Sequence, residues 1–191
     1  MKEKNMPSNK FLATNSDKRL HRWGFKDSGF ELIEEKSVTF SGDRYEVSGT
    51  VMPDFIPYIE SVLGIDFNKE DQIEPVDSKP TQPPNIDQAF LESLKESFDE
   101  DRYTLDDMER LIHSHGQETF KDVYKVLYNA IDRTVDLVFY PESESEVKKI
   151  VDLAVRFNIC LIPYGGGTNV TRALTIPENE NRTVVSIDMR R

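Results

Sequence analysis

Three glycines in a row, Gly165–Gly167, follow directly on a short apolar run at residues 159–163. Two more apolar runs, at residues 135–140 and 183–188, have the length and composition of buried strands. Between the runs at 135–140 and 159–163, residues 143–158 carry a helical pattern. This order of strand, helix, strand, glycine loop and strand predicts an α/β unit, and we expect its sheet to be unfinished where the chain ends.

The helix at residues 143–158 has a start signal, an apolar stripe and a stop signal. Ser143 and Glu146 form a capping box, S-x-x-E, at its start. Asn158 is a residue type that adopts the left-handed backbone found at helix ends. The stripe has helical spacing and consists of Val147, Ile150, Val151, Ala154 and Val155.

The glycine loop has the chemistry of a diphosphate site. Consecutive glycines expose backbone N–H groups and allow a bulky anion to approach closely. Thr168 and Asn169 add side-chain donors. The loop lacks both the lysine of a P-loop and the spacing G-x-G-x-x-G, so neither of those motifs applies. From spacing alone, the three glycines are explained equally well by a diphosphate site and by a tight turn that binds no ligand.

The charge balance decides how such an anion is held. The chain has 24 basic and 35 acidic side chains, which gives a net charge of -11. An acidic chain repels phosphate backbones and anionic membranes, so we expect no nucleic-acid partner. A phosphate ligand has to be held locally, by backbone N–H groups or a few placed cations. No apolar run reaches the roughly 20 residues of a membrane helix, so no transmembrane segment is predicted.

Upstream of the α/β unit the sequence predicts a mainly helical region. Residues 1–19 have the composition of a flexible leader, and residues 20–131 form the helical region. A linker with four prolines interrupts it at residues 69–85. Ser-Gly-Asp between two β-prone runs predicts a β-hairpin at residues 37–47. Residues 132–191 then begin the α/β unit, so the expected fold class is α+β.

Four helices are expected in the upstream region. Asp54 is placed to cap the first and Gly64 to end it. Asp87 is placed to cap the second, and Thr104-x-x-Asp107 resembles a capping box before the third. The apolar faces expected for the last three are Phe90, Leu91, Leu94 and Phe98, then Leu105, Met108, Leu111 and Ile112, then Phe120, Val123, Tyr124, Leu127 and Ile131.

Cysteine, histidine and the acidic clusters predict no separate site. Cys160 is the one cysteine and is expected to be a small buried residue in a strand. His113 and His115 are two residues apart and do not share a helix face. The acidic clusters at 99–101 and 106–107 lack EF-hand spacing. We therefore predict no metal ligand.

Several segments of the chain resemble known flavoproteins. Pro141, an amphipathic helix and the segment CLIPYGGGTNVTRAL resemble the first FAD-binding subdomain of the vanillyl-alcohol-oxidase or PCMH superfamily. Upstream segments are similar to one branch, the alkyldihydroxyacetonephosphate synthase (alkylglycerone-phosphate synthase) family. These are RWGFKDSGF at 22–30, GDRYEVSG at 42–49, ERLIHSHG at 109–116 and VDLVFYPESESEVKKIV at 135–151. Several segments in the same order are more specific than one glycine loop.

The resemblance implies FAD as the cofactor, with its pyrophosphate against the glycine loop. The family often has serine where Asn169 stands and arginine where His113 stands. Its members are also longer, and the family's catalytic tyrosine and histidine cluster find no counterpart here, so no catalytic residue is named. The implied FAD contacts are Pro163, Tyr164, Gly165, Gly166, Gly167, Thr168 and Asn169.

The implied reaction exchanges the acyl chain of acyl-dihydroxyacetone phosphate for a fatty alcohol, which makes the ether bond of ether lipids. The resemblance also implies a homodimer and a peroxisomal location, although the chain carries no recognisable targeting signal. We expect the chain by itself to be inactive and to bind FAD weakly or not at all, since it holds one loop of the cradle. An exposed strand edge at residues 183–188 is expected to favour aggregation.

Two other functions stay open at this point. One is an FAD-linked 2-hydroxy-acid dehydrogenase-like oxidoreductase of the same superfamily, because the glycine loop is common to both. The other is a complete, non-catalytic paralogue that acts as an interaction module through its helical region. The upstream segments favour the synthase.

Overall fold

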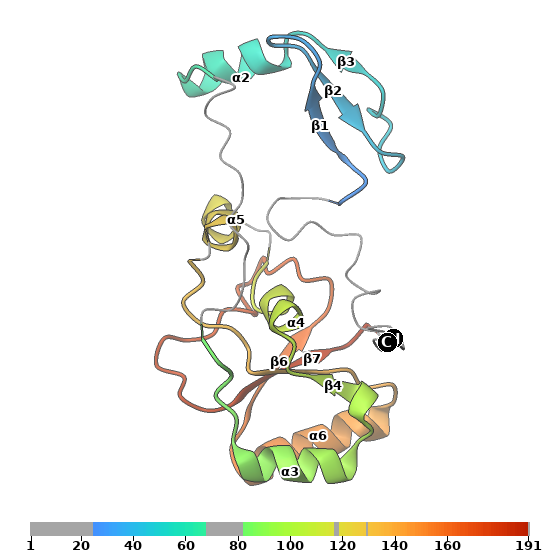
Figure 1. Ribbon diagram of the computed structural model, residues 1–191, viewed down its shortest axis with the longest axis vertical. Coiled ribbons are helices and arrows are strands. Elements are labelled where there is room, and N and C mark those ends of the chain that lie inside the picture. The colour runs from blue at the N-terminus through green and yellow to red at the C-terminus, as the bar shows by residue number, and fades with distance from the viewer. Residues whose placement is uncertain (1–24, 68–81, 117–118, 129, 191) are drawn as a thin grey trace, which may run out of the picture. The chain divides into compact units, whose positions relative to one another are not determined.

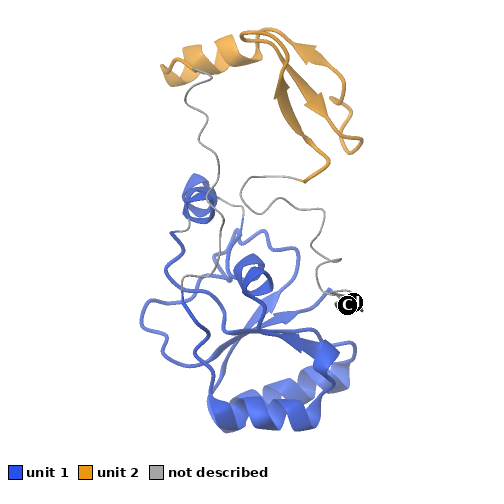
Figure 2. Cartoon of the chain, viewed as in Figure 1, with its two compact units in different colours: residues 1–14, 76–191 blue, residues 15–75 orange. Residues whose placement is uncertain are grey.

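The computed structural model describes residues 25–67, 82–116, 119–128 and 130–190. The chain divides into two compact units (Figure 2). Unit 1 consists of residues 1–14 and 76–191, and unit 2 of residues 15–75. The predicted leader, 1–19, and most of the predicted linker, 69–85, lie outside the described residues, so the predicted domain boundaries stay predictions.

Within its described residues, unit 1 is built on a four-stranded sheet of order β4-β5-β7-β6 (Figure 1). β5 and β6 run parallel to β7, and β4 runs antiparallel to β5. The strand bounds are Tyr103–Thr104 for β4, Leu137–Phe139 for β5, Cys160–Tyr164 for β6 and Val184–Asp188 for β7. A short 3-10 helix, η2 (Glu100–Arg102), leads into β4.

The position of β7 in this sheet corrects one expectation. We predicted an exposed strand edge at residues 183–188, and this is wrong. β7 is the last strand in the chain but inserts between β5 and β6, so both of its edges are paired and all its residues are buried. The edge strands are β4 and β6 instead, because parallel strands joined by crossovers need not lie in chain order.

One face of the sheet is covered by α3 (Gln88–Ser97) and α6 (Glu144–Phe157), which lie against each other below the sheet in Figure 1. Alternate residues of each strand point to this face. The rings of Phe98 and Phe139 meet edge to face, with centroids 4.7 Å apart. The other buried members of this core are Phe90, Leu94, Leu137, Ile150, Ala154, Ile159, Val185 and Ile187.

The predicted start of α3 and the start and stop of α6 are confirmed, although the Glu146 half of the predicted capping box is not formed, because its carboxylate accepts from the N–H of Glu142 at 2.6 Å. The Asp87 carboxylate accepts a hydrogen bond from the N–H of Phe90 at 2.8 Å. The Ser143 hydroxyl accepts one from the N–H of Glu146 at 3.2 Å. These caps satisfy donors that have no partner inside the helix. Asn158 ends α6 in the left-handed conformation, with φ of 56°.

The opposite face of the sheet carries a second apolar cluster, closed by the loop that follows β6. Leu174 of that loop packs among side chains from β5, β6 and β7. α4 (Asp107–Ile112) lies on the same side, above the sheet in Figure 1. The buried members are Val135, Val138, Tyr140, Ile162, Tyr164, Leu174 and Val184. The glycine loop is thus anchored at both ends in a packed core.

α4 begins two residues later than predicted. Asp106 caps it, because its carboxylate accepts from the N–H groups of Met108 and Glu109 at 3.0 Å each. Thr104 lies in β4, paired with Val138 across the sheet. The capping box predicted at Thr104 is therefore wrong, since pairing with β5 holds that residue in an extended strand.

α5 (Phe120–Leu127) starts with a capping box formed by Thr119 and Asp122. Its predicted apolar face is wrong for the outermost residues. The side chains of Phe120 and Tyr124 are 81% and 59% exposed, whereas Val126, on another face of the helix, is 1% exposed. Helical spacing identified an apolar stripe, but packing in this chain buries a different side.

The described part of unit 2 holds a three-stranded antiparallel sheet of order β1-β2-β3 and the helix α2. Their bounds are Gly29–Leu32 for β1, Val38–Ser41 for β2, Val51–Met52 for β3 and Phe55–Leu63 for α2. α2 begins after Asp54 and ends at Gly64, whose φ is 65°, so its predicted bounds are confirmed. The predicted cap is wrong, because the Asp54 side chain makes no capping hydrogen bond. The α+β class is confirmed, because both units combine sheet and helix.

The β-hairpin predicted at residues 37–47 pairs differently in the structure. β2 is a strand as expected, but residues 44–47 are not, and β2 pairs with β1 before it and β3 after it. The ring of Tyr45 packs edge-on against Phe40 at 5.4 Å. The N–H of Gly49 donates to the Phe40 carbonyl at 2.8 Å. The run around Tyr45 therefore folds back on β2 as a loop.

Within residues 25–67, 82–116, 119–128 and 130–190, no helix combines the length and the apolar character that crossing a membrane requires.

Candidate functional site

The glycine loop forms one wall of a cavity of about 190 Å³ at the carboxyl end of β6. In parallel sheets, ligands bind at the carboxyl ends of the strands. Every predicted contact residue except Tyr164 lines this cavity, and none of the lining residues is basic. The lining residues are Pro163, Gly165, Gly166, Gly167, Thr168, Asn169, Val170, Thr171, Ala173 and Leu174. An anion here would be held by backbone N–H groups and hydroxyls.

The three glycines of the loop differ in whether the fold requires glycine at that position. A Cβ atom on Gly165 would meet nothing within 4 Å, and one on Gly166 would come no closer than 4.0 Å to Thr168. Neither residue has a positive φ. The fold itself therefore does not require glycine at these two positions. Glycine there leaves room for a group outside the chain to lie on the backbone.

Gly167, in contrast, is required by the fold. Its φ is 69°, and a Cβ atom would lie 2.3 Å from the hydroxyl oxygen of Tyr164. Tyr164 is 3% exposed and lies beneath the loop. Its side chain thus supports the loop from inside, while the neighbouring glycines face the cavity.

Asn169 is tied to the loop itself. Its φ is 58°, and its side-chain oxygen accepts a hydrogen bond from the N–H of Leu174 at 2.9 Å. Its carbonyl accepts another from the N–H of Arg172 at 2.9 Å. Asparagine tolerates the left-handed region better than most residues, and here its side chain closes the turn. Its role as an FAD contact stays a prediction.

A second segment packs against the back of the loop. Gly116 follows α4, and a Cβ atom there would lie 2.2 Å from Cβ of Asn169 and 2.9 Å from the carbonyl oxygen of Thr168. Only glycine allows this approach. The segment ERLIHSHG therefore has a physical connection to the glycine loop, although more than fifty residues separate them in the chain.

Beside the loop lies a largely buried polar group of side chains, which we call the carboxyl-end cluster. His113 is fully buried, and its Nε2 lies 3.1 Å from Oδ2 of Asp188. The hydroxyl of Tyr140 donates to Oε2 of Glu109 at 2.6 Å. The cluster consists of Glu109, His113, Tyr140, Tyr164, Asp188 and Arg190. It joins α4 to the carboxyl ends of β5, β6 and β7.

Charge in the cluster is balanced by direct pairing. Burial alone would raise the pKa of the Asp188 carboxyl, but hydrogen bonds from Arg190 and His113 outweigh it and hold that pKa well below its usual range. Arg190 donates from Nε to Asp188 at 2.8 Å, and its guanidinium lies 4.9 Å from the centre of the Tyr164 ring. Burial also raises the pKa of the Tyr164 hydroxyl, so this group stays neutral at physiological pH.

The sequence did not predict this cluster. His113 was expected to have only a surface or packing role, and Glu109 and Asp188 were not singled out. One signal was available, since Asp188 ends an otherwise apolar strand, and a charged residue in such a run needs a buried partner. Among the residues that the structure describes, no group of three or more His, Cys, Asp or Glu side chains is placed to hold a metal ion.

At the amino end of the strands, a second buried network is structural. Asp136 accepts hydrogen bonds from the N–H groups of Asn85 and Val184 at 2.7 and 2.8 Å. Arg110, fully buried, donates to the carbonyl of Val135 at 2.8 Å and to the Thr134 hydroxyl at 3.1 Å. These bonds attach α4 and the segment before α3 to the sheet.

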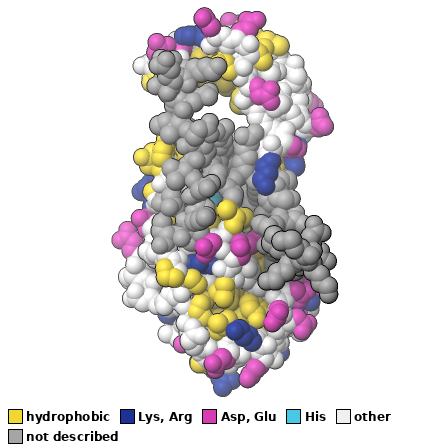
Figure 3. All heavy atoms as spheres, viewed as in Figure 1, with side chains coloured by type: hydrophobic (Ala, Val, Ile, Leu, Met, Phe, Trp, Pro, Cys, Tyr) yellow, Lys and Arg dark blue, Asp and Glu magenta, His cyan; other side chains and the backbone are white. Residues whose placement is uncertain are grey.

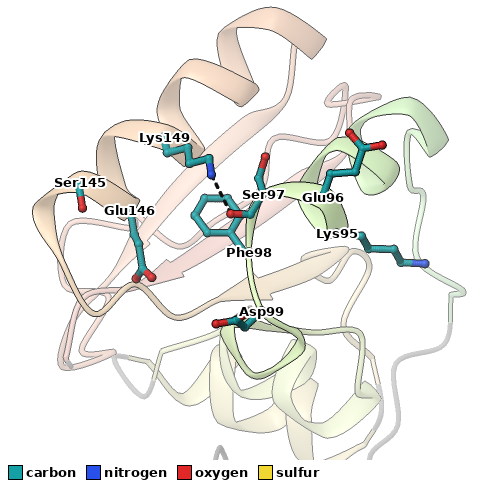
Figure 4. A pocket seen from close by; sticks show the side chains of 8 residues that line it. All are labelled: Lys95, Glu96, Ser97, Phe98, Asp99, Ser145, Glu146 and Lys149. Carbon is teal, nitrogen blue, oxygen red and sulfur yellow. Dashed lines mark hydrogen bonds between the residues drawn. The ribbon is translucent and has the colours of Figure 1, made fainter.

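A larger cavity of about 390 Å³ lies between the end of α3 and the start of α6 (Figure 4). Lys149 donates from Nζ to the carbonyl of Ser97 at 2.8 Å, which closes one side. The remaining lining residues mix cations and carboxylates: Lys95, Glu96, Phe98, Asp99, Ser145 and Glu146. In the face drawn in Figure 3, described Lys and Arg side chains are likewise scattered among Asp and Glu. This cavity has no concentration of one charge for an anion.

The comparisons with known proteins agree with this site. Residues 135–191 match the model of an FAD binding domain. An alkyldihydroxyacetonephosphate synthase from Caenorhabditis elegans is 38% identical over 167 residues, which are 87% of this chain and 28% of that protein. The chain is a homologue of alkyldihydroxyacetonephosphate synthase. The match reaches far beyond the glycine loop, so the upstream segments contribute to it.

A solved structure of alkyldihydroxyacetonephosphate synthase supports the same conclusion. It superposes with a TM-score of 0.77 at 26% identity, covering 93% of this chain and 33% of that one. A mitochondrial D-lactate dehydrogenase (cytochrome) from Arabidopsis thaliana is 31% identical over 90 residues, 47% of this chain and 14% of that protein. The prediction of FAD as cofactor is confirmed at the level of the matched domain. The chain spans less than a third of the length of the synthases that it matches.

Proposed function

We propose that this chain supplies the pyrophosphate-binding part of a flavoenzyme of the alkyldihydroxyacetonephosphate synthase type. Such an enzyme exchanges the acyl chain of acyl-dihydroxyacetone phosphate for a fatty alcohol and so forms an ether lipid precursor. The proposal joins the homology of most of the chain with the geometry of one loop. It assigns the synthase activity to the longer protein and the cofactor loop to this chain.

The observation that carries the proposal is the open space over Gly165 and Gly166. A Cβ atom on either residue would meet no close neighbour among the described residues, and both residues line the cavity at the carboxyl end of β6. A diphosphate fits these positions, because it needs several donors and close backbone approach. The backbone N–H groups of residues 165–168 and the hydroxyl of Thr168 would hold it.

The absence of basic residues from the cavity lining fits the same ligand. Backbone N–H groups hold a diphosphate without adding side-chain charge, which suits a chain with a net charge of -11. When bound, the flavin ring of FAD supplies the reactive group of the family's reaction. The residues of this chain bind and orient the opposite end of the cofactor, so we assign no catalytic residue here.

Substrates, location and assembly are proposals of the same kind. We propose acyl-dihydroxyacetone phosphate and a fatty alcohol as substrates of the whole protein, a peroxisomal location and a homodimer. By itself the chain is expected to be inactive and to bind FAD weakly or not at all, because it holds one side of the cradle. These points follow the family resemblance rather than the geometry of the site.

A second candidate is a flavin-linked 2-hydroxy-acid dehydrogenase, which the match to the D-lactate dehydrogenase favours. The dehydrogenase match covers 47% of this chain, whereas the synthase match covers 87% of it. The greater extent of the synthase match favours the synthase. Product analysis with acyl-dihydroxyacetone phosphate and with D-lactate would distinguish them in the longer protein.

The test of the proposal is a titration of FAD with the chain, followed by the fluorescence anisotropy of the flavin. We expect weak binding that ADP displaces and riboflavin does not, because the loop holds the diphosphate. Gly166→Val should weaken binding by about tenfold or more, since its side chain fills the space for the ligand. Ser145→Val, in the second cavity, is the matched control and should leave affinity unchanged.

Two results would overturn the proposal. Displacement by riboflavin and not by ADP would remove the pyrophosphate assignment. If the chain shows no binding, a version extended past Arg191 is titrated in the same way. Absence of flavin binding in that version as well would mean that the flavoprotein assignment is wrong.

A further inference from the structure

We propose that His113 is a positioning residue that holds the glycine loop in its binding conformation through Asp188, Tyr164 and Gly116. The inference rests on the proposed function for what the loop binds, but it concerns the shape of the loop before any ligand arrives. It assigns a role to a buried histidine that does not line the cavity. Among the described residues, this histidine also belongs to no group of side chains that could hold a metal ion.

His113 sits between two hydrogen-bond acceptors. Its Nδ1 lies 2.7 Å from the carbonyl oxygen of Glu109, and its Nε2 lies 3.1 Å from the Asp188 carboxylate. A carbonyl and a carboxylate only accept, so both contacts are satisfied when both ring nitrogens carry hydrogen. The side chain is fully buried, which makes the loss of either partner costly. The imidazole therefore joins the end of α4 firmly to the end of β7.

The first route from His113 to the loop passes through Tyr164. The two rings are in contact, with centroids 4.3 Å apart. Tyr164 is the last residue of β6, and its hydroxyl occupies the space that a side chain on Gly167 would need. The position of the imidazole thus sets the position of the ring on which the third glycine rests.

The second route passes along the chain. His113 is the C-cap of α4, and Gly116 follows three residues later. Gly116 packs against Thr168 and Asn169 at distances that only glycine allows. If the end of α4 shifts, this contact shifts with it. His113 therefore affects the loop at two places, at Gly167 through Tyr164 and at residues 168–169 through Gly116.

The charged and titratable groups that face His113 come from every element packed against it. Glu109 lies on α4, with Oε2 3.8 Å from Nδ1. Asp188 at the end of β7 is bound in addition by Arg190. Tyr140 after β5 presents its ring edge-on at 5.8 Å. These groups pair with one another in the interior, and removal of one member leaves its buried partner without a hydrogen bond.

Amide hydrogen exchange of the full chain without flavin tests the inference, using two substitutions that each keep one half of the imidazole. In His113→Asn, the side-chain amide nitrogen takes the place of Nδ1, and the bond to Asp188 is lost. In His113→Gln, the side-chain amide nitrogen takes the place of Nε2, and the bond to Asp188 is kept. We expect His113→Asn to speed exchange at residues 165–174 by about tenfold, as loss of a charge-assisted bond implies, and His113→Gln to stay close to the parent protein.

Ser186→Ala is the matched control. Ser186 is fully buried on the same strand and face as Asp188, and its hydroxyl has no hydrogen-bond partner among the described residues. Its removal should leave the loop unchanged. Exchange in α3 and α6 reports on the fold as a whole and should stay constant in each variant. Asp188→Asn should loosen the loop as His113→Asn does, and serves if that variant does not fold.

Three results would overturn the inference. The first is exchange of the loop at the parent rate in both His113→Asn and Asp188→Asn. The second is faster exchange in α3 and α6 by as much as in the loop. The third is faster exchange of the loop in Ser186→Ala by as much as in His113→Asn. Because the measurement needs no flavin, its failure leaves the proposed function standing. Conversely, a chain that does not bind FAD still gives a definite answer about His113.

Discussion

The two units of this chain use similar residues with opposite results. In unit 1 the sheet is covered on both faces, and apolar side chains of β5, β6 and β7 are buried. In unit 2 the helix α2 has no buried residue, and the described apolar core is reduced to Val38. Tyr58 and Leu63 of α2 are 67% and 62% exposed. Correct helix and strand signals therefore produce elements in both units, but a core in only one.

The difference teaches that an element and its burial have separate causes. α2 has the cap position and the glycine stop expected of a helix, and it forms. Its apolar residues lack a covering layer among the described residues, so they contribute little burial energy. In unit 2 a few aromatic contacts remain, such as the stacked rings of Phe30 and Phe55 at 4.9 Å. We expect unit 2 to open more readily than unit 1.

The largest effect is expected from the core of unit 1. Phe139→Ala removes a fully buried ring at the centre of the sheet, against Phe98. We expect a loss of about 3–5 kcal/mol in the free energy of unfolding. Denaturant unfolding followed by circular dichroism measures it. A loss below about 1 kcal/mol would mean that unit 1 is packed no better than unit 2.

Two glycines with nearly the same backbone compare the units directly. Gly167 in unit 1 has φ of 69° and Gly64 in unit 2 has φ of 65°, but only Gly167 has a neighbour, Tyr164, where a Cβ atom would lie. Alanine at Gly64 should cost about 1 kcal/mol, from backbone strain alone. Alanine at Gly167 should cost about 3 kcal/mol, because strain and overpacking add. Thermal melting of both variants measures the difference, and equal losses would contradict the packing of Tyr164.

Acid should act on unit 1 through Asp188. Its pKa in the folded protein lies below the ordinary value of 3.8, so the stability it contributes is present above that pH and is lost as pH falls toward the lowered pKa. Between pH 5 and pH 2 we expect the parent protein to lose about 1–2 kcal/mol more than Asp188→Asn, which lacks the titrating group. Parallel acid denaturation curves for the two proteins would show that the pairing contributes nothing.

The smallest effect is expected in unit 2. Phe30 is 55% exposed although it lies in a strand. Phe30→Ala should lower the free energy of unfolding by less than about 1 kcal/mol, in contrast to the same change at Phe139. Hydrogen exchange at residues 29–41 measures it locally. A loss as large as that of Phe139→Ala would show that unit 2 depends on this ring as on a core residue.

Much of the fold was predictable because its signals are local. The caps at Asp87 and Ser143 and the stops at Gly64 and Asn158 act within one helical turn. The glycine loop was found in the same way, from adjacent residues. Its three glycines proved to be of two kinds, however, and spacing does not distinguish a glycine kept for packing from one that leaves room for a ligand.

The errors concern partners distant in the chain. Thr104 was expected to cap a helix, but a strand more than thirty residues later holds it in the sheet. The run around Tyr45 was expected to be a strand, but it packs back on β2 as a loop. The apolar stripe of α5 was expected to be buried, but Phe120 and Tyr124 of that stripe are exposed, and Val126 on another face of the helix is buried. In each case a tertiary contact outweighed a local preference.

The sequence by itself determined the helices, the strands β5, β6 and β7, and the glycine loop that follows a strand, since capping, periodicity and glycine geometry depend on neighbours within a few residues. Tertiary structure alone decided that β7 lies inside the sheet, that Gly116 supports the loop, and that His113 and Asp188 meet. Those pairings join residues that are 24 to 75 positions apart. Their free energy comes from burial and close packing, which exist only once the chain has folded.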